Sequence, residues 1–274
     1  MVFAQAKGVS VRPLNTMRKD QRTPSDQFGH ASRFTLHSSV PRVRESDLPR
    51  CIGVSRFTLY ALLIGGLLIT SAQSAGDKFV IAQVQYGGGG DWYGDQTTIP
   101  NWLKILRTRT DIETVDDRVI VKLTDRNLYL YPMLYIVGHG NIRFTEKEVQ
   151  ALRSYLTHGG FLFANDDYGL DKSFRREMRR IFPDQELQPI PSSYLIYHCF
   201  YDFPNGLPKI HEHDGEPAQG FGLFHEGRLV VYYVHSSDIG DGLEDPRVHP
   251  NDTNEVRELA AKMAVNIAVY ALTH

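Results

Sequence analysis

Three apolar segments, each followed by a glycine- or aspartate-rich loop, constrain the fold of this chain most strongly. They cover residues 79–86, 131–137 and 161–164. A nearly continuous apolar run of this length is typical of a strand that is buried on both faces of a sheet. Helical patterns separate the segments, and such an alternation predicts a mostly parallel sheet with helices on both faces.

The helix predicted after residue 144 has the clearest local signals. Thr145 and Glu148 have the spacing of a capping box, in which each side chain bonds the backbone amide of the other. Leu152 and Leu156 continue an apolar stripe with helical spacing, and the glycine pair at 159–160 predicts the end of the helix. These residues predict an amphipathic helix between two buried strands.

Weaker patterns complete a predicted α/β domain over residues 76–274. We expect a helix near Pro100 and a hairpin that turns at Glu226 and Gly227. Residues 183–218 are predicted to form a long ordered excursion. Two further amphipathic helices are expected, one with Arg175, Arg176, Arg179 and Arg180 facing away from the sheet, and a C-terminal one with Val256, Leu259, Met263 and Ile267 facing inward.

The charge of the chain changes abruptly near residue 56. Residues 1–56 carry ten Lys and Arg and four Asp and Glu, and residues 57–75 carry no charged side chain. Residues 76–274 carry twenty Lys and Arg and twenty-eight Asp and Glu. The first segment is predicted to be a disordered leader, or the product of a start placed too far upstream. The acidic balance of the remainder argues against a nucleic-acid partner, because phosphate binding needs clustered Lys and Arg.

Residues 57–75 have the layout of an export signal. A basic flank precedes the apolar run 57–70, and small residues lead to Ala75. The run is closer to the about 7–15 apolar residues of a signal peptide than to the about 20 of a spanning helix. We therefore expect either cleavage after Ala75 or an uncleaved anchor through 57–70. In both cases the domain is exported, to the periplasm or to the outer side of the cytoplasmic membrane.

Three of the predicted strands end in unusual loops, at 87–93, 138–141 and 165–169. Ligands of open α/β sheets bind beyond the carboxyl ends of the strands, so we expect these loops to meet in a site. The first loop lets the backbone approach a ligand or bind an anion through its amides, or it simply reverses the chain. Its predicted ligand-binding residues are Gly87, Gly88, Gly89, Gly90, Asp91 and Trp92.

The other two loops supply the candidate catalytic residues. His139 stands between two glycines, where a nucleophile elbow would carry Ser or Cys, and is a candidate base, metal ligand or polar hinge. Asp166 and Asp167 offer a general base or a ligand for a hard cation. Adjacent strand residues face opposite ways, so one of the two is expected to cap the next turn instead. Tyr168 offers an aromatic surface to a ligand.

A divalent metal is the one cofactor that the sequence indicates. His211 and His213 alternate on an extended segment and would share one face, as two zinc ligands do, with His198 as a further candidate. Ordinary loop hydrogen bonding is the alternative. A second candidate, for calcium, is an acidic loop that lacks the twelve-residue hand pattern and carries Asp238, Asp241, Glu244 and Asp245.

Several stretches together resemble the bacterial family catalogued as domain of unknown function 4159. They are residues 85–93, 135–144, 159–169, 197–203 and 206–211, with 265–273 at the end. The resemblance implies a fold like the class I glutamine amidotransferase superfamily, which is a flavodoxin-like doubly wound sheet, and a bacterial cell-envelope setting. It implies no established reaction. Glutamine hydrolysis is not expected, because His139 stands where the glutaminase elbow needs Cys.

The first functional hypothesis is therefore a non-enzymatic, exported envelope domain. It would bind a small molecule or a partner envelope protein at the carboxyl edge of the sheet. The alternative is a metal-assisted hydrolase that uses His139, Asp166 or Asp167, with His198, His211 and His213 as ligands. A third hypothesis is a structural assembly component without a binding site.

Overall fold

The computed structural model describes residues 78–211 and 213–274. The predicted leader (1–56) and export segment (57–75) lie outside the described residues. The strands are β1 (Ile81–Val84), β2 (Val119–Val121), β3 (Met133–Ile136), β4 (Phe161–Asn165), β5 (Gln188–Pro189), β6 (Gln219–His225) and β7 (Arg228–His235). The helices are α2 (Thr98–Arg109), α3 (Glu146–Thr157), α4 (Asp171–Ile181), α5 (Ile239–Leu243) and α6 (Asn254–Thr273), with short 3-10 turns at Leu128–Leu130 and Leu195–Tyr197. Within the described part of the chain, no helix combines the length and apolar character needed to cross a membrane.

The strands form one mixed sheet in the order β2-β1-β3-β4-β7-β6-β5. The five strands from β2 to β7 run parallel, and β6 and β5 add an antiparallel edge. The predicted mostly parallel α/β fold is therefore confirmed. The placement of β1 between β2 and β3 is consistent with a flavodoxin-like sheet, in which the strand order reverses next to the first strand.

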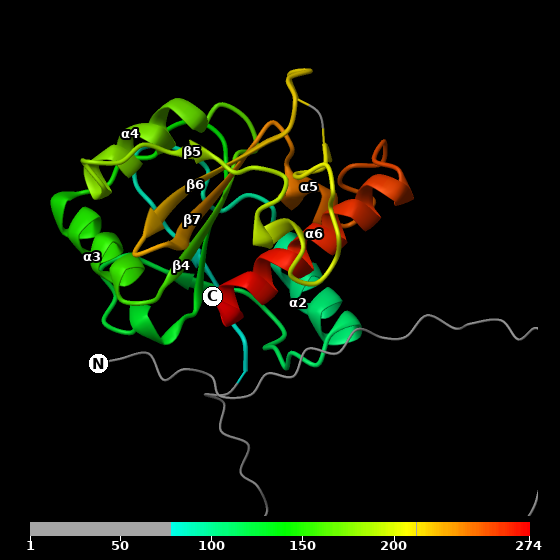
Figure 1. The fold of residues 1–274 in the computed structure, drawn as a ribbon, viewed down its shortest axis with the longest axis horizontal. Helices are drawn as coiled ribbons and strands as arrows, with labels where there is room; N and C mark the ends of the chain where they lie inside the picture. Colours follow the sequence, from blue (N-terminus) through cyan, green and yellow to red (C-terminus); the bar gives the residue numbers. More distant parts are fainter. Residues whose placement is uncertain (1–77, 212) are drawn as a thin grey trace, which may run out of the picture. The chain divides into compact units, whose positions relative to one another are not determined.

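Helices cover both faces of this sheet (Figure 1). The α3 and α4 helices lie against one face, and α2 and α6 lie against the other. Successive strand residues point to opposite faces, so Leu134 packs with the α3 and α4 side while Tyr135 packs with the α2 and α6 side. Trp102 of α2 is fully buried against Tyr135 and Phe163. Each face thus has its own apolar core.

The predicted cap of α3 is confirmed. The Thr145 side chain accepts from the backbone N–H of Glu148, and the Glu148 carboxylate accepts from the backbone N–H of Thr145 at 2.7 Å. In α6, however, the inward placement of Leu259 is wrong, because its exposed fraction is 36%. The buried stripe runs through Ala260, Met263 and Ile267 instead.

The arginines of α4 do not form a uniformly solvated face. Arg176 and Arg180 both form ion pairs with the buried Glu177. They also donate hydrogen bonds to the backbone carbonyls of Ile142 and Phe144. These two arginines therefore hold the segment after β3 against α4, and none of the four arginines is among the buried residues of this helix, as predicted.

Asn266 of α6 fixes the long excursion that precedes β6. Its side chain donates to the carbonyls of Ile196 and Tyr201 at 3.0 and 2.8 Å and accepts from the Tyr201 N–H at 2.7 Å. Further along, the N–H groups of Ile210 and His211 donate to the Ser237 carbonyl just after β7. The excursion is thereby led back to the carboxyl edge of the sheet.

Candidate functional site

The loops after β1, β3 and β4 lie side by side at the carboxyl edge of the sheet. The Gly90 N–H donates to the Asn141 carbonyl at 3.0 Å, and the Arg143 N–H donates to the Gly87 carbonyl at 2.8 Å. A β-bridge joins His139 to Tyr168. The convergence expected from strand order is therefore present in the structure.

The glycine loop owes two of its glycines to close backbone packing. A Cβ at Gly88, where φ is +115°, would lie 2.6 Å from the Arg143 nitrogen. A Cβ at Gly90 would lie 2.7 Å from the His139 carbonyl oxygen. Close approach to the 139–143 segment explains these residues without a ligand, so the ligand-binding role of Gly87, Gly88, Gly89 and Gly90 stays a prediction.

Asp91 orients His139. One Asp91 oxygen accepts from the His139 backbone N–H, and the other lies 3.2 Å from Nδ1 of the imidazole. The Asp167 carboxylate lies 3.8 Å from the same nitrogen. The His139 side chain is 53% exposed, so a carboxylate-supported imidazole faces the edge of the sheet. Trp92 is half-buried, and its carbonyl accepts from the Gln83 amide at 2.7 Å.

Asp166 and Asp167 point to different partners. Asp166 accepts from the Leu170 N–H and from the Tyr233 hydroxyl, both at 2.9 Å, and thus caps the turn that leads into α4. Asp167 accepts from the Asn165 amide at 2.9 Å. Of the two neighbours, Asp167 is the one that contacts His139.

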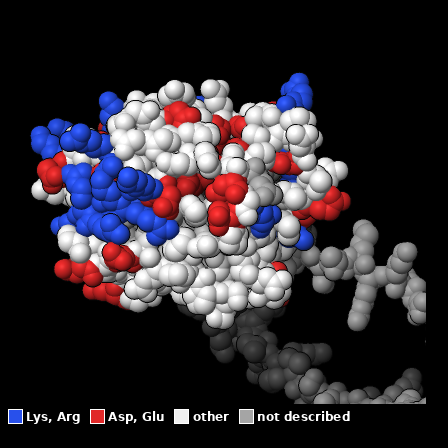
Figure 2. Space-filling model, turned by 90° about the horizontal axis from the view of Figure 1, so that it is seen from above, with Lys and Arg blue, Asp and Glu red and all other residues white. Residues whose placement is uncertain are grey.

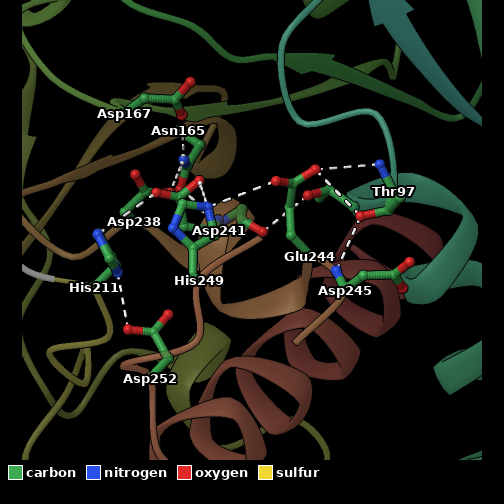
Figure 3. A network of polar contacts seen from close by, with 12 residues as sticks. Thr97, Asn165, Asp167, His211, Asp238, Asp241, Glu244, Asp245, His249 and Asp252 are labelled. Carbon is green, nitrogen blue, oxygen red and sulfur yellow. Dashed lines mark hydrogen bonds and ion pairs between the residues drawn. The ribbon is translucent and has the colours of Figure 1, made fainter. Parts of the chain in front are cut away.

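A histidine–carboxylate centre lies around Asp241 and comprises His211, His213, Asp238, Asp241, Glu244 and His249. Figure 3 labels these residues except His213. One Asp241 oxygen lies 3.2 Å from Nε2 of His249, and the other lies 3.9 Å from Nε2 of His211. Glu244 approaches the same His249 nitrogen at 3.5 Å. Ligand-type atoms of His211, Asp241 and His249 all lie within 4.8 Å of one another.

Carboxylates also orient the imidazole rings of His211 and His213 in this centre. Nδ1 of His211 contacts Asp252 at 2.9 Å, which leaves Nε2 directed at Asp241. Nε2 of His213 contacts Asp238 at 2.8 Å, and its ring lies 5.7 Å from that of Tyr168 and 6.3 Å from that of His139. A carboxylate behind an imidazole is the usual support of a metal-binding histidine.

His198 does not join this centre. Its Nδ1 contacts Asp202 at 2.5 Å and its Nε2 contacts the Ser192 carbonyl at 2.7 Å. The structure thus brings together two of the three histidines predicted as ligands, His211 and His213, whose rings are 4.9 Å apart. Asp245, from the predicted calcium loop, contacts Asn101 of α2 instead.

The carboxylates of this region lack basic partners other than histidine. Among residues 78–211 and 213–274, no Lys or Arg forms an ion pair with Asp95, Asp167, Asp238, Asp241 or Glu244. Burial and the charge of Asp238 raise the pKa of Asp95, Asp167 and Asp241. Burial and the neighbouring His211 lower the pKa of His249, which favours the neutral imidazole that metals bind.

The backbone is strained at the same place. Asp95, Ser236 and Asp238 have φ values of 49°, 54° and 53°. A left-handed conformation costs a non-glycine residue about 1–3 kcal/mol and persists where the surrounding structure enforces it, often at a functional site. The strain therefore supports a functional role for the loops after β1 and β7.

Sequence reasoning missed three residues of this region, Asp95, His249 and Asp252. Asp95 follows the glycine loop, and the other two lie in the segment between β7 and α6. The rule that sites lie beyond the carboxyl ends of parallel strands applies to β7 as well, and it would have extended the predicted acidic loop 238–245 to the whole segment 236–252. No local spacing marks His249 as a neighbour of His211.

A separate groove of about 790 Å³ lies beside the glycine loop and α4. It is lined by Gly88, Asn141, Arg143, Phe144, Thr145, Glu146, Arg176, Glu177 and Arg180, none of which belongs to the histidine–carboxylate centre. Figure 2 shows Lys and Arg gathered on one side of this view and Asp and Glu in other patches of it. The groove and the histidine–carboxylate centre share no residue and are distinct features.

Fold and site together define an α/β domain that gathers imidazoles and carboxylates at the carboxyl edge of a mixed sheet. The chain belongs to the family described as Domain of unknown function (DUF4159), whose model matches residues 80–272. This finding confirms the family resemblance of the sequence. A comparison with curated proteins finds no match.

Cys199 is expected to be a poor nucleophile. Its Sγ lies 3.2 Å from the Asn266 carbonyl, and burial raises the pKa of the thiol to about 12. Because the thiolate is the reactive form, labelling at pH 8 should be at least about 100-fold slower in the folded chain than in guanidinium. The measurement is the rate of Ellman's reaction in a Cys51→Ser variant. Equal rates in the folded and unfolded chains would contradict this expectation.

Proposed function

We propose that this domain binds a divalent metal ion through Asp241, His211 and His249, and that the ion holds a small ligand or a group of an envelope protein. The observation that carries the proposal is the contact between Asp252 and Nδ1 of His211. This contact leaves Nε2 of His211 directed at the Asp241 carboxylate, and the same carboxylate contacts Nε2 of His249.

Distances support an ion shared by these three side chains. Zinc binds imidazole nitrogen and carboxylate oxygen at about 2.0–2.2 Å, so tetrahedral ligand atoms lie about 3.4 Å apart. The nitrogens of His249 and His211 lie 3.2 and 3.9 Å from the Asp241 oxygens. Only small side-chain shifts are needed to reach ligand distance. Mixed imidazole and carboxylate donors suit zinc better than calcium or magnesium.

Zinc affinity is the direct test of this proposal. The stripped full-length chain should take up one zinc ion per molecule in equilibrium dialysis, and Asp241→Asn and His249→Ala should abolish the uptake. Asp252→Asn, which alters only the support of His211, should weaken it about 10–100-fold. At 100 times its dissociation constant, zinc should add about 2.7 kcal/mol to the free energy of unfolding.

His198→Ala is the matched control, because this histidine also pairs with an aspartate but stands outside the centre. Its zinc uptake should equal that of the wild type. No zinc uptake by the wild type, or an equal loss in His198→Ala and His249→Ala, would refute the proposal.

Metal-assisted hydrolysis is a second candidate function, favoured by the Asp91–His139 pair. A bound metal ion lowers the pKa of its water, and an imidazole backed by a carboxylate can transfer a proton near it. The His139 ring lies 6.3 Å from the ring of His213. Nε2 of His213 in turn lies 3.7 Å from Asp241, one of the proposed zinc ligands. Asp167, 3.8 Å from Nδ1 of His139, would support the same imidazole.

The zinc-loaded chain should hydrolyse an activated ester such as p-nitrophenyl acetate if this second candidate is correct. His139→Ala should lower the rate about 100- to 10,000-fold, the range of general acid–base catalysis, while zinc uptake stays unchanged. A rate that survives both this substitution and removal of zinc would exclude the hydrolytic role.

We also propose that the domain acts outside the cytoplasm. The charge change near residue 56 and the apolar run 57–70 support export. N-terminal sequencing of protein from the cell envelope should begin at Gly76 if the signal is cleaved. A chain that keeps residues 57–70 would instead be anchored to the membrane. Recovery of the chain from the cytoplasm alone would contradict export.

Membership of the glutamine amidotransferase-like superfamily remains a proposal as well. The mixed sheet is compatible with it, and His139 occupies the turn after β3 where the elbow cysteine would stand. The buried Cys199 belongs to the excursion before β6. These two facts argue against glutaminase chemistry for this chain, whichever superfamily it joins.

A further inference from the structure

A second group of ligand-type atoms shares Asp238 with the histidine–carboxylate centre and consists of carboxylates alone. The oxygens of Asp95, Asp167 and Asp238 lie within 4.8 Å of one another. The exposed fractions of Asp167 and Asp238 are only 1% and 0%. The three residues follow β1, β4 and β7, so this carboxylate triad joins the ends of three parallel strands.

Four side-chain polar atoms among the described residues are buried without a hydrogen-bond partner, and three of them lie close to this triad. These three are Oδ2 of Asp95, Oδ2 of Asp167 and the hydroxyl of Tyr135, whereas the fourth, Oδ2 of Asp252, lies beside His211. Oδ2 of Asp167 also lies 3.8 Å from Nδ1 of His139, which is beyond hydrogen-bond distance. Tyr135 is fully buried. A buried polar atom without a partner destabilises the fold, and native structures contain few of them. Three orphans close to one triad therefore need a common explanation.

The position of Gly240 shows that two of these orphans point to one place. A Cβ on Gly240 would lie 2.7 Å from Oδ2 of Asp95 and 2.8 Å from the Tyr135 hydroxyl. The same Cβ would lie 3.1 Å from the side-chain nitrogen of Asn165, which donates to both Asp167 and Asp238. The absence of a side chain at residue 240 lets these oxygen atoms converge.

Either a shared proton or a cation offsets the repulsion among closely spaced carboxylates. A shared proton joins two oxygens at about 2.5–3.0 Å. A cation lies between several oxygens at longer mutual distances, and it can also accept the Tyr135 hydroxyl oxygen as a ligand. The oxygens of the triad lie within 4.8 Å of one another, which leaves room for a cation.

We propose that Asp95, Asp167 and Asp238, together with the Tyr135 hydroxyl, hold a calcium-like cation. The donors are all oxygen, which favours a hard cation, and calcium tolerates irregular oxygen cages better than magnesium does. This buried site is distinct from the proposed zinc site and shares no residue with Asp241, His211 and His249. It can therefore exist even if the zinc site does not.

The cation has a structural role in this proposal. It offsets the repulsion among carboxylates that three separate loops bring together, and it ties those loops at the carboxyl edge. Terbium is a suitable probe because it replaces calcium and emits light when a nearby aromatic ring is excited. Tyr135 contributes to the site, and the Trp102 ring lies 6.0 Å from the Tyr135 ring.

Titration of the stripped full-length chain with terbium should give saturable emission, one ion per chain, that calcium displaces. Asp167→Asn should weaken terbium binding at least 10-fold, and Tyr135→Phe should lower the emission while the chain stays folded. Zinc uptake by both variants should persist, which separates this test from that of the zinc site.

Asp245→Asn is the matched control, since Asp245 lies in the same region but contacts Asn101 instead of the triad. Its terbium emission should match that of the wild type. The proposal is overturned if the wild-type chain gives no saturable emission, if Asp167→Asn binds terbium normally, or if Asp245→Asn loses binding equally. It is also overturned if calcium leaves the melting temperature of the wild type unchanged.

Discussion

The side chain of Asn165 holds the carboxyl edge of the sheet together. It is fully buried at the end of β4, donates to Asp167 at 2.9 Å and to Asp238 at 2.8 Å, and accepts from the Ile239 N–H at 2.9 Å. One amide thereby joins the loop after β4 to the loop after β7 and to the start of α5. The positions of the neighbouring carboxylates depend on this link.

The arrangement collects negative charge that the described part of the chain does not balance with Lys or Arg. Among the described residues, histidines are the only basic side chains that contact these carboxylates, and strained backbone at Asp95 and Asp238 adds to the cost. A fold maintains such a costly arrangement where function requires it. Metal ions would offset the repulsion and use the directed imidazoles, which is why both proposed sites lie at this edge.

Much of the fold follows from local sequence patterns. The buried strands, the capping box of Thr145 and Glu148 and the hairpin before α6 were predictable, because strand burial, caps and turns depend on neighbours in sequence. Leu259 was predicted wrongly for a different reason. Which side of a helix is buried depends on the elements packed against it, and in α6 the buried stripe runs through Ala260, Met263 and Ile267.

The candidate site was predictable only in outline. The rule on carboxyl ends located the loops that carry His139 and Asp167, but His249 and Asp252 join His211 through contacts between distant parts of the chain. The path of the excursion, set by Asn266 and Ser237, decides that His211 and His213 reach the edge while His198 does not. No spacing in the sequence carries that information.

Anomalous diffraction at the zinc absorption edge, from crystals of the full-length chain grown with zinc, tests the central claim most directly. We expect a peak within about 2.0–2.2 Å of Nε2 of His211, Nε2 of His249 and a carboxylate oxygen of Asp241. A zinc peak at His198 and Asp202 with none at Asp241, or no peak on the chain at all, would contradict the account.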